Sequence, residues 1–385
     1  MNIVHIAPTA PYNDYWGYQE NILPKYQKRL GHNVTLIITN LMHEDGEIIE
    51  TNCADYTLDD GVRVIRLKRK EYFSRLLTRF NAKLCVYDLL KKLRPDFIFL
   101  HGLASVTIFE AIKYKKKINK QCKIVMDSHS DYDNSGICKN WKHKIIRFLY
   151  RLRYKKALRY VERFYGVTPW RKTYIEDYYQ IPSTQTDVLI MGADDEKIDF
   201  AHRDQIRSKI REAYSIGPKE FLIVTGGKID AKKNITQLMR ACSGFDDIKL
   251  LVFGNVHDSI KDEFYSLVKN NSNIIYIGWI DADKVYDYFF AADLAFFPGG
   301  HSVLWEQACA AKVPCVFGRW EGTDHVNNGG NSDFIFPVNE QTIKEKIVEL
   351  KFTEKYQRMK EVAESKNTDI YLYSEIAKKS LECMK

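Results

Sequence analysis

The chain lacks the features that mark membrane-spanning and secreted proteins. No apolar run approaches the roughly 18–20 residues that a bilayer-spanning helix needs. The apolar stretch within residues 1–11 breaks at prolines, and it has neither the basic region nor the long apolar region of a signal peptide. Solenoid-length repeats and low-complexity tracts are missing as well. These absences predict a soluble protein that stays in the cytosol.

The cysteines form no metal-binding or disulfide pattern. All eight occur singly, mostly inside apolar runs, and no Cys-x-x-Cys pair is present. The spacing therefore argues against a zinc site and against a disulfide framework. We expect reduced thiols that are mostly buried.

The length of the chain predicts more than one domain, and its charge is unevenly distributed. A chain of 385 residues is too long for one compact core, and 45% hydrophobic with 28% charged residues is usual for globular proteins. The net charge of +8 is uneven: residues 1–195 hold 32 Lys+Arg and 22 Asp+Glu, and the remainder hold 26 and 28. The basic half is therefore the first one, which bears on what that half contacts.

Short apolar runs alternate with helical patterns in two series. Most runs are apolar throughout, as in parallel strands that are buried on both faces. In the first series they span 2–7, 33–38, 62–67, 97–101, 123–127, 164–168 and 187–191. In the second series they span 221–225, 248–254, 273–277, 293–298, 313–317 and 333–337.

This repetition predicts an α/β fold with two Rossmann-like domains. The series are separated near residue 193, where a glycine and an acidic cluster interrupt the pattern. We expect one domain over 1–192, a second over 193–367, and an amphipathic C-terminal helix over 368–385 that returns to the first domain. In such folds ligands bind beyond the carboxyl ends of the strands, so the residues that follow each strand matter most.

Three segments that follow strands carry chemistry. Tyr15-Trp16-Gly17 precedes a helix, and its glycine allows either a close-approaching ligand or an ordinary turn. The segment Gly227–Asn234 places Lys228 and Lys233 where both amines reach one diphosphate, although loop lysines are often merely solvated.

The third segment, 298–308, combines small residues and a hydroxyl at the start of a helix with one acid, Glu306, on a largely apolar helix. A buried carboxylate needs a partner there, and sugar hydroxyls are suitable ones. The alternative is a capped core helix with one satisfied acid.

Together these motifs resemble the GT-B glycosyltransferases of glycosyltransferase family 4 along the whole chain. The similar segments are the Gly17 loop, Gly31-His32-Asn33-Val34, Met191-Gly192-Ala193-Asp194, the segment 227–234 and Ile277-Gly278-Trp279-Ile280. The resemblance implies a GT-B fold with two domains facing a central cleft. It also implies retaining transfer of a sugar from a nucleotide diphosphate sugar, most simply a UDP-sugar, to a glycan or lipid-linked acceptor in bacterial surface polysaccharide synthesis.

The resemblance also implies roles for residues. Lys228 and Lys233 would neutralise the diphosphate without a metal or other cofactor, and Glu306 would hold the ribose. His129 would line the reaction centre. The remaining donor contacts would be Gly17, Gly227, Trp279, Ile280, Gly300, His301, Ser302, Val303 and Leu304, and the acceptor contacts would be Tyr15, Trp16 and His101.

One departure concerns the donor sugar. Family members carry two glutamates eight positions apart; the second matches Glu306, but the position of the first is Pro298. His301 is the candidate substitute. A hydrolysing nucleotide-sugar epimerase and a non-catalytic GT-B scaffold are the alternative functions. Two Asp-x-Asp sequences, at 131–133 and 281–283, match a metal-binding pattern of another transferase fold, but the second more simply caps a helix.

The stretch 139–163 is strongly basic, with ten Lys+Arg and one acid. Trp141, Ile145, Phe148, Leu149 and Leu152 recur there at near-helical spacing. One interpretation is a core-packed helix with a solvated basic side; the other is peripheral contact with an anionic membrane on the inner face. No nucleic-acid recognition module is present, so nucleic acid is not an expected partner.

Overall fold

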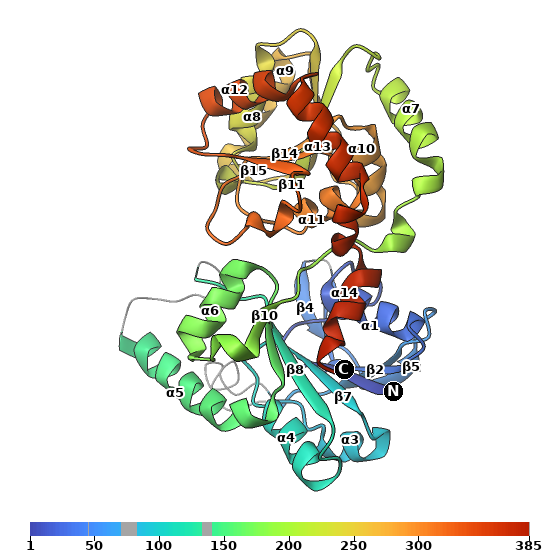
Figure 1. The fold of residues 1–385 in the computed structure, drawn as a ribbon, viewed down its shortest axis with the longest axis vertical. Helices are drawn as coiled ribbons and strands as arrows, with labels where there is room; N and C mark the ends of the chain where they lie inside the picture. The colour runs from blue at the N-terminus through green and yellow to red at the C-terminus, as the bar shows by residue number, and fades with distance from the viewer. Residues whose placement is uncertain (45, 71–82, 133–140, 385) are drawn as a thin grey trace. The chain divides into compact units, whose positions relative to one another are not determined.

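A computed structural model describes residues 1–44, 46–70, 83–132 and 141–384, with side chains omitted for 141–143. The chain divides into two compact units, each of which makes most of its contacts internally. The first is Met1–Ile190 with Ile376–Lys385, and the second is Met191–Glu375. Each unit is built on a largely parallel sheet with helices on both faces (Figure 1). Among the described residues, none of the helices combines the length and the apolar character needed to cross a membrane.

The first unit is built on an eight-stranded sheet of order β10-β9-β8-β7-β1-β2-β6-β5, in which only β5 is antiparallel to its neighbour. Its strands are β1 (Asn2–Ala7), β2 (Asn33–Thr39), β5 (Ala54–Thr57), β6 (Arg63–Leu67), β7 (Phe97–His101), β8 (Lys123–Ser128), β9 (Arg163–Gly166) and β10 (Thr186–Val188). Its helices are α1 (Gln19–Arg29), α3 (Tyr87–Leu93), α4 (Ile108–Lys117), α5 (Trp141–Ala157) and α6 (Pro169–Tyr179).

The alternation of side chains along β1 and β7 divides this unit into two layers. Val4 and Ile98 belong to the core cluster that includes residues of α3, α4, α5 and α6. His5 and His101 point to the opposite face, where His5 contacts Gln27 of α1 and Gln27 contacts Ser380 of α14 (Tyr373–Ser380). The second face therefore carries a buried polar chain in place of a purely apolar core.

The second unit is a six-stranded parallel sheet of order β13-β12-β11-β14-β15-β16. Its strands are β11 (Phe221–Ile229), β12 (Ile248–Val256), β13 (Ile274–Tyr276), β14 (Leu294–Phe297), β15 (Cys315–Gly318) and β16 (Ser332–Ile335). Its helices are α7 (Arg203–Ala213), α8 (Ile235–Ser243), α9 (Lys261–Asn270), α10 (Val285–Ala291), α11 (Leu304–Ala310), α12 (Glu340–Leu350) and α13 (Glu354–Glu364). Short 3-10 turns include η5 (Ala231–Lys233), η8 (Asp324–Val326) and η9 (Lys366–Tyr371).

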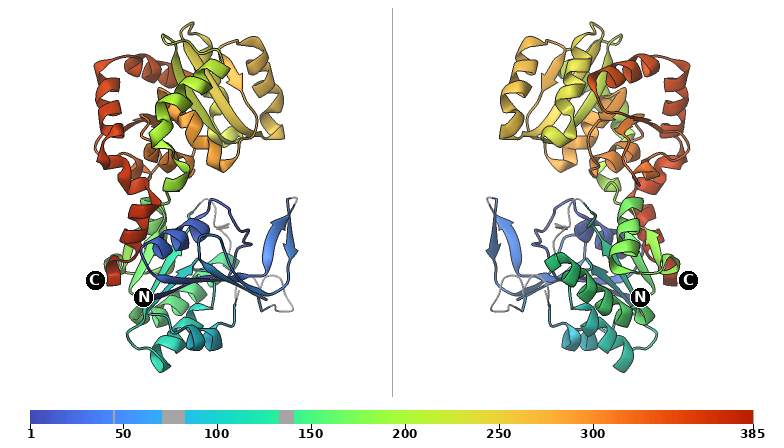
Figure 2. Two further views of the ribbon diagram at one scale, coloured as in Figure 1. Left: turned by 90° about the vertical axis from the view of Figure 1, so that its right-hand side faces the viewer. Right: turned by 90° about the vertical axis from the view of Figure 1, so that its left-hand side faces the viewer.

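The predicted parallel strands of both series are confirmed, and three antiparallel strands were missed. The missed elements are β5 and the hairpin of β3 (Leu41–Glu44) and β4 (Glu47–Glu50), which stands out from the sheet of the first unit (Figure 2). The final segment also differs from the expected continuous helix, because η9 ends at Tyr371 and α14 covers only Tyr373–Ser380 before a last turn, η10 (Glu382–Met384).

The expectation of mostly buried thiols holds for Cys122, Cys242, Cys309 and Cys315, whereas Cys53 and Cys85 are exposed. All are unpaired, and Cys138 lies outside the described residues.

Candidate functional site

Two loops meet at the carboxyl ends of β11 and β14 in the second unit. Glycines permit this contact: a Cβ on Gly299 would lie 2.2 Å from the Cα of Lys233, and one on Gly227 would lie 2.9 Å from the Cδ1 of Leu304. Gly227 also has φ +105°, a conformation that favours glycine. The segment after β11 therefore lies directly against the segment that enters α11.

Lys233 joins these loops through its ammonium group. Its Nζ donates to the carbonyl oxygen of Gly300 at 2.6 Å and lies 3.2 Å from that of His301. Burial lowers the pKa of Lys233, and the nearby charge of Asp230 opposes that effect. Lys233, expected to neutralise the diphosphate, thus also holds the α11 loop in place.

Lys228 differs from Lys233 in its surroundings. Its side chain is 66% exposed, and its Nζ lies 3.4 Å from the carboxylate of Asp230. Such an exposed pair contributes little to stability. Lys228 is therefore available to an anion at this edge of the sheet.

The amides at the start of α11 complete an anion-binding surface. Among the hydrogen bonds of the described residues, none has the backbone N–H of Ser302, Val303 or Leu304 as its donor. A Cβ on Gly300 would meet no atom within 4 Å, so open space adjoins this segment. Free amides next to a lysine are the arrangement that favours phosphate oxygens.

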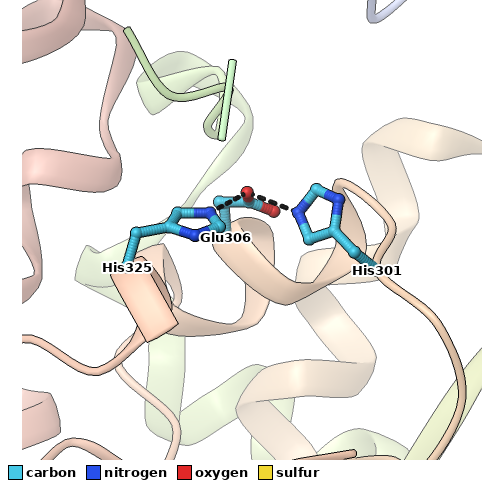
Figure 3. Close-up of side chains that lie close together, drawn as sticks. All are labelled: His301, Glu306 and His325. Carbon is cyan, nitrogen blue, oxygen red and sulfur yellow. Dashed lines mark hydrogen bonds and ion pairs between the residues drawn. The ribbon is translucent and has the colours of Figure 1, made fainter. Parts of the chain in front are cut away.

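Glu306 lies in α11, fully buried between two histidines (Figure 3). The Nε2 atoms of His301 and His325 lie 2.7 Å and 2.8 Å from the same carboxylate oxygen, Oε1. The other oxygen, Oε2, has no hydrogen-bond partner among the described residues. The expected buried carboxylate is therefore present, with one oxygen hydrogen-bonded and the other buried without a partner in the described part of the chain.

The histidines keep Glu306 ionised. Burial raises the pKa of a carboxyl group, but His301 and His325 outweigh burial and lower the pKa of Glu306 to about 2. His301, which was expected to face the donor sugar, directs Nε2 at Glu306. Its ring packs edge-on against Trp305, with 5.3 Å between the ring centroids.

His325 was not predicted. It lies in η8, beyond the carboxyl end of β15, so its place after a strand was the signal available.

The loop after β13 holds the predicted base-flanking residues. Gly278 (φ +75°) accepts from the amide of Gly254 at 2.7 Å, which fixes the loop beside β12. The indole of Trp279 is exposed, and Ile280 is half-buried. Asp281 makes no side-chain capping bond, contrary to expectation, and Asp283 binds Lys197 at 2.5 Å.

In the first unit, Tyr15, Trp16 and Gly17 form a loop before α1. The Tyr15 side chain is exposed, whereas the ring of Trp16 stacks on that of His43, with 5.3 Å between the ring centroids. A Cβ on Gly17 would meet no atom within 4 Å, so the packing of the chain itself does not require glycine there. The open space next to Gly17 is accessible to a ligand.

His101 and His129 share a carboxylate that the sequence did not single out. Asp127 lies at the end of β8, accepts from the Gly102 amide at 2.9 Å and lies 2.8 Å from the Nδ1 of His101. The Nε2 of His129 lies 3.7 Å from the same carboxylate. Burial disfavours a charged imidazole, but Asp127 outweighs burial and raises the pKa of His129.

The chain of buried polar groups continues behind His101. The Nε2 of His101 lies 3.0 Å from the Nδ1 of His5, and the Nε2 of His5 lies 2.7 Å from the Oε1 of Gln27. Burial and the neighbouring His101 lower the pKa of His5 to about 3, so His5 is neutral. His101, expected to contact the acceptor, is thus 3% exposed and belongs to this internal chain.

Two family models match the chain. The model described as Glycosyltransferase Family 4 matches residues 23–197, and the model described as Glycosyl transferases group 1 matches residues 206–366. No curated protein sequence matches the chain.

Solved structures with the same fold cover nearly the full length. A glycosyltransferase from Rickettsia africae is 16% identical, with a TM-score of 0.71 over 99% of this chain and 97% of that one. Anabaena Alr3699/HepE in complex with UDP is 14% identical, with a TM-score of 0.67 over 100% and 99%. WaaG, a glycosyltransferase involved in lipopolysaccharide biosynthesis, is 16% identical, with a TM-score of 0.61 over 98% of both chains.

Proposed function

Because the chain is a GT-B glycosyltransferase of the family 4 type, we propose that it transfers a sugar, with retention of configuration, from a UDP-sugar to a glycan or lipid-linked acceptor. A bacterial surface polysaccharide is the proposed product. The single observation that supports the donor class is the pairing of an anion site with a buried carboxylate. A nucleotide sugar needs both, one for its diphosphate and one for its ribose hydroxyls.

The anion site consists of Lys228 and the free amides of Ser302, Val303 and Leu304, with Lys233 beside them. In the proposed mechanism these groups stabilise the charge that develops on the leaving diphosphate, without a catalytic metal. Gly227 and Gly300 leave room for the phosphates to approach the backbone. The charge of Lys228 is exposed before binding and becomes desolvated by the ligand, which strengthens its attraction.

Glu306 provides the proposed ribose contact. Oε1 already accepts from two imidazoles, so the partnerless Oε2 is the oxygen that would accept from a ribose hydroxyl. Trp279 and Ile280 would flank the base. The ribose hydroxyl would then satisfy a buried polar atom of the protein, which favours binding.

The acceptor is proposed to bind the first unit at Tyr15 and Trp16, with His129 lining the reaction centre. Transfer would take place on one face of the sugar, with the diphosphate helping to take the acceptor proton, so no enzyme nucleophile is required. Asp127 would keep His129 oriented in the reaction centre.

The donor proposal is tested by thermal unfolding with UDP, GDP, ADP, CMP and dTDP, each with magnesium or with a chelator. A ligand that binds only the folded chain raises the unfolding temperature, and it does so more the more tightly it binds. We expect a selective rise with UDP that the chelator does not change. A chain that none of the nucleotides stabilises would not be a nucleotide-sugar transferase of the proposed kind.

We also propose that α5 contacts an anionic membrane surface. Ile145, Phe148, Leu149 and Leu152 recur at helical spacing and are between 43% and 59% exposed. The core-packed interpretation is therefore wrong for these four side chains, and Trp141 lies outside the described side chains. No acidic residue occurs within α5, and Lys144, Lys155 and Lys156 are exposed. An exposed apolar stripe with basic flanks is the pattern of interfacial helices.

Vesicle flotation tests this contact. The chain should float with phosphatidylserine-containing vesicles, less at high salt, and not with phosphatidylcholine alone. Phe148→Asp with Leu152→Asp should abolish flotation, whereas Val348→Asp, on the exposed side of α12, should not. Equal flotation with both vesicle types at low salt would rule out an electrostatic membrane contact.

A further inference from the structure

His301, Glu306 and His325 form a compact group of ligand atoms. Among the described residues, they are the one set of three or more His, Cys, Asp or Glu side chains whose ligand atoms all lie within 4.8 Å of one another. They come from the loop before α11, from α11 and from η8, all in the second unit (Figure 3). We propose that these side chains bind a first-row transition-metal ion, best Zn²⁺, and that the bound ion inhibits the enzyme by occupying Glu306.

The donor set selects the class of ion. Two imidazole nitrogens and one carboxylate suit Zn²⁺, Co²⁺ and Ni²⁺, which accept three protein ligands and an open fourth position. Mg²⁺ and Ca²⁺ prefer sets of six or more oxygen ligands, which this group does not offer. The site should therefore discriminate against the divalent ions that assist many phosphate-binding enzymes.

A bound ion would provide a partner for the unsatisfied oxygen of the buried Glu306 carboxylate. Glu306 is fully buried, and its Oε2 has no partner among the described residues. Coordination that includes Oε2 supplies a partner for this atom. The side chains of His301 and His325 are 9% and 8% exposed, so the three groups are already largely removed from water. An ion is attracted more strongly in such surroundings than on an exposed surface.

Neutral imidazoles can bind the ion without a net release of protons. Each Nε2–H that now donates to Oε1 becomes a metal-binding nitrogen when its ring proton moves to Nδ1, so no net proton is released. The Nδ1 of His325 has no partner among the described residues, so this change of tautomer costs His325 no hydrogen bond at that atom. The two hydrogen bonds to Oε1 are exchanged for two metal–nitrogen bonds and a metal–oxygen bond.

The group is held in place by its neighbours. The hydroxyl of Tyr371 donates to the carbonyl oxygen of His325 at 2.7 Å, and the ring of His301 packs edge-on against Trp305. Zn–N and Zn–O bonds of roughly 2.0–2.2 Å place ligand atoms farther apart than the present hydrogen bonds do. Binding thus requires the rings to turn slightly outward around the ion.

The inhibitory part rests on the proposed function. If Oε2 of Glu306 accepts from the ribose, an ion that coordinates Oε2 takes the oxygen that the ribose needs. Zn²⁺ should therefore compete with the nucleotide and should not assist the transfer.

Metal binding is measured on the full chain, purified without a polyhistidine tag and stripped with a chelator. Titration with Co²⁺ alone should produce the visible bands of a four-coordinate site at one equivalent, and Zn²⁺ should displace them while excess Mg²⁺ does not. His325→Asn and His301→Asn should weaken binding at least tenfold. His257→Asn, which alters an exposed histidine that contacts Ser259, should leave binding unchanged.

Several results would overturn the site: no four-coordinate bands, unchanged affinity in His325→Asn, or loss of binding in His257→Asn. Urea unfolding checks that each variant is folded. Should His325→Asn fail to fold, Glu306→Gln, which keeps the side-chain shape and removes the charge, serves as the second variant and should also lose the ion.

Competition is measured separately, by the UDP-induced rise in unfolding temperature with and without one equivalent of Zn²⁺. Zn²⁺ should reduce the rise in the wild-type chain and not in His325→Asn. An unchanged rise in zinc-loaded wild type would overturn the inhibition. Cobalt bands in a chain that UDP does not stabilise would leave the metal site in place and reject the proposed donor, so the two failures are distinguishable.

Discussion

At the scale of single residues, Glu306 couples the candidate site to the stability of the second unit. Its folded pKa of about 2 lies below the ordinary carboxyl value of 4.5. A carboxyl with a depressed folded pKa stabilises the fold above its unfolded pKa, and this stabilisation is lost as the pH falls toward the folded pKa. The window for Glu306 is therefore pH 4.5 down to about 2.

We expect the free energy of unfolding to fall by about 2 kcal/mol between pH 6 and pH 3 because of this one group, since each unit of pKa difference is worth about 1.4 kcal/mol. Glu306→Gln should remove that share of the pH dependence. Urea unfolding of both chains at several pH values measures it, and parallel curves for the two chains would show that Glu306 is not held ionised by the histidines.

Substitutions at three glycines separate the requirements of folding from those of ligand binding. A Cβ on Gly17 or Gly300 would meet no atom within 4 Å, whereas one on Gly226 would lie 2.5 Å from the backbone oxygen of Phe253. Gly17→Ala and Gly300→Ala should keep the wild-type unfolding temperature and lower transfer activity, because the added methyl group occupies ligand space. Gly226→Ala should lower the unfolding temperature itself. Full activity in Gly300→Ala would show that no phosphate group lies against Gly300.

The residues that sequence reasoning missed are those whose roles depend on distant partners. Glu306 could be singled out because an acid on an apolar helix is unusual, and His129 because it matches a family histidine. His325, Asp127 and His5 carry no such local signal: each gains its role from a side chain 19 to 96 positions away. Only the folded arrangement reveals these pairs.

At the scale of elements, the parallel strands were predictable because they are buried on both faces and read as continuous apolar runs. β3, β4 and β5 are short, partly exposed and mixed in composition, for example Glu47–Glu50 with its exposed ends. Their pairing satisfies backbone groups more than it buries side chains, so the apolar pattern does not mark them. The α5 stripe was visible as a pattern, but only the packing shows that it faces outward.

The contact between the β11 and α11 loops depends on Lys233. Lys233→Met should lower stability by about 1–3 kcal/mol, since it removes a charge-assisted hydrogen bond to the Gly300 carbonyl. Lys228→Met should change stability by less than about 0.5 kcal/mol, because that side chain is exposed. Both variants should weaken UDP binding.

Urea unfolding with and without UDP separates the two roles. If Lys228→Met binds UDP as tightly as wild type, Lys228 is only a solvated surface lysine. If Lys233→Met is as stable as wild type, the ammonium does not hold the α11 loop.

At the scale of the whole molecule, the chain crosses from the second unit back to the first at its end. Residues Ile376–Lys385 group with the first unit, where Ile376, Ala377 and Ser380 are buried. The hydroxyl of Ser380 accepts from Gln27 at 2.9 Å, which connects this segment to the His5–His101–Asp127 chain. The first unit is therefore incomplete without the last ten residues of the sequence.

Removal of residues 376–385 should destabilise the first unit and leave the second unit folded. Calorimetry distinguishes them, because only the transition of the UDP-binding unit rises with UDP; we expect that transition to persist in the truncated chain while the other moves to lower temperature. Ser380→Ala tests the contribution of the Gln27 contact alone. It leaves the buried Gln27 amide without its acceptor, which should cost about 1–3 kcal/mol and shift the same transition by less. A truncated chain that keeps both transitions at their wild-type temperatures would show that the first unit does not need these residues for its stability.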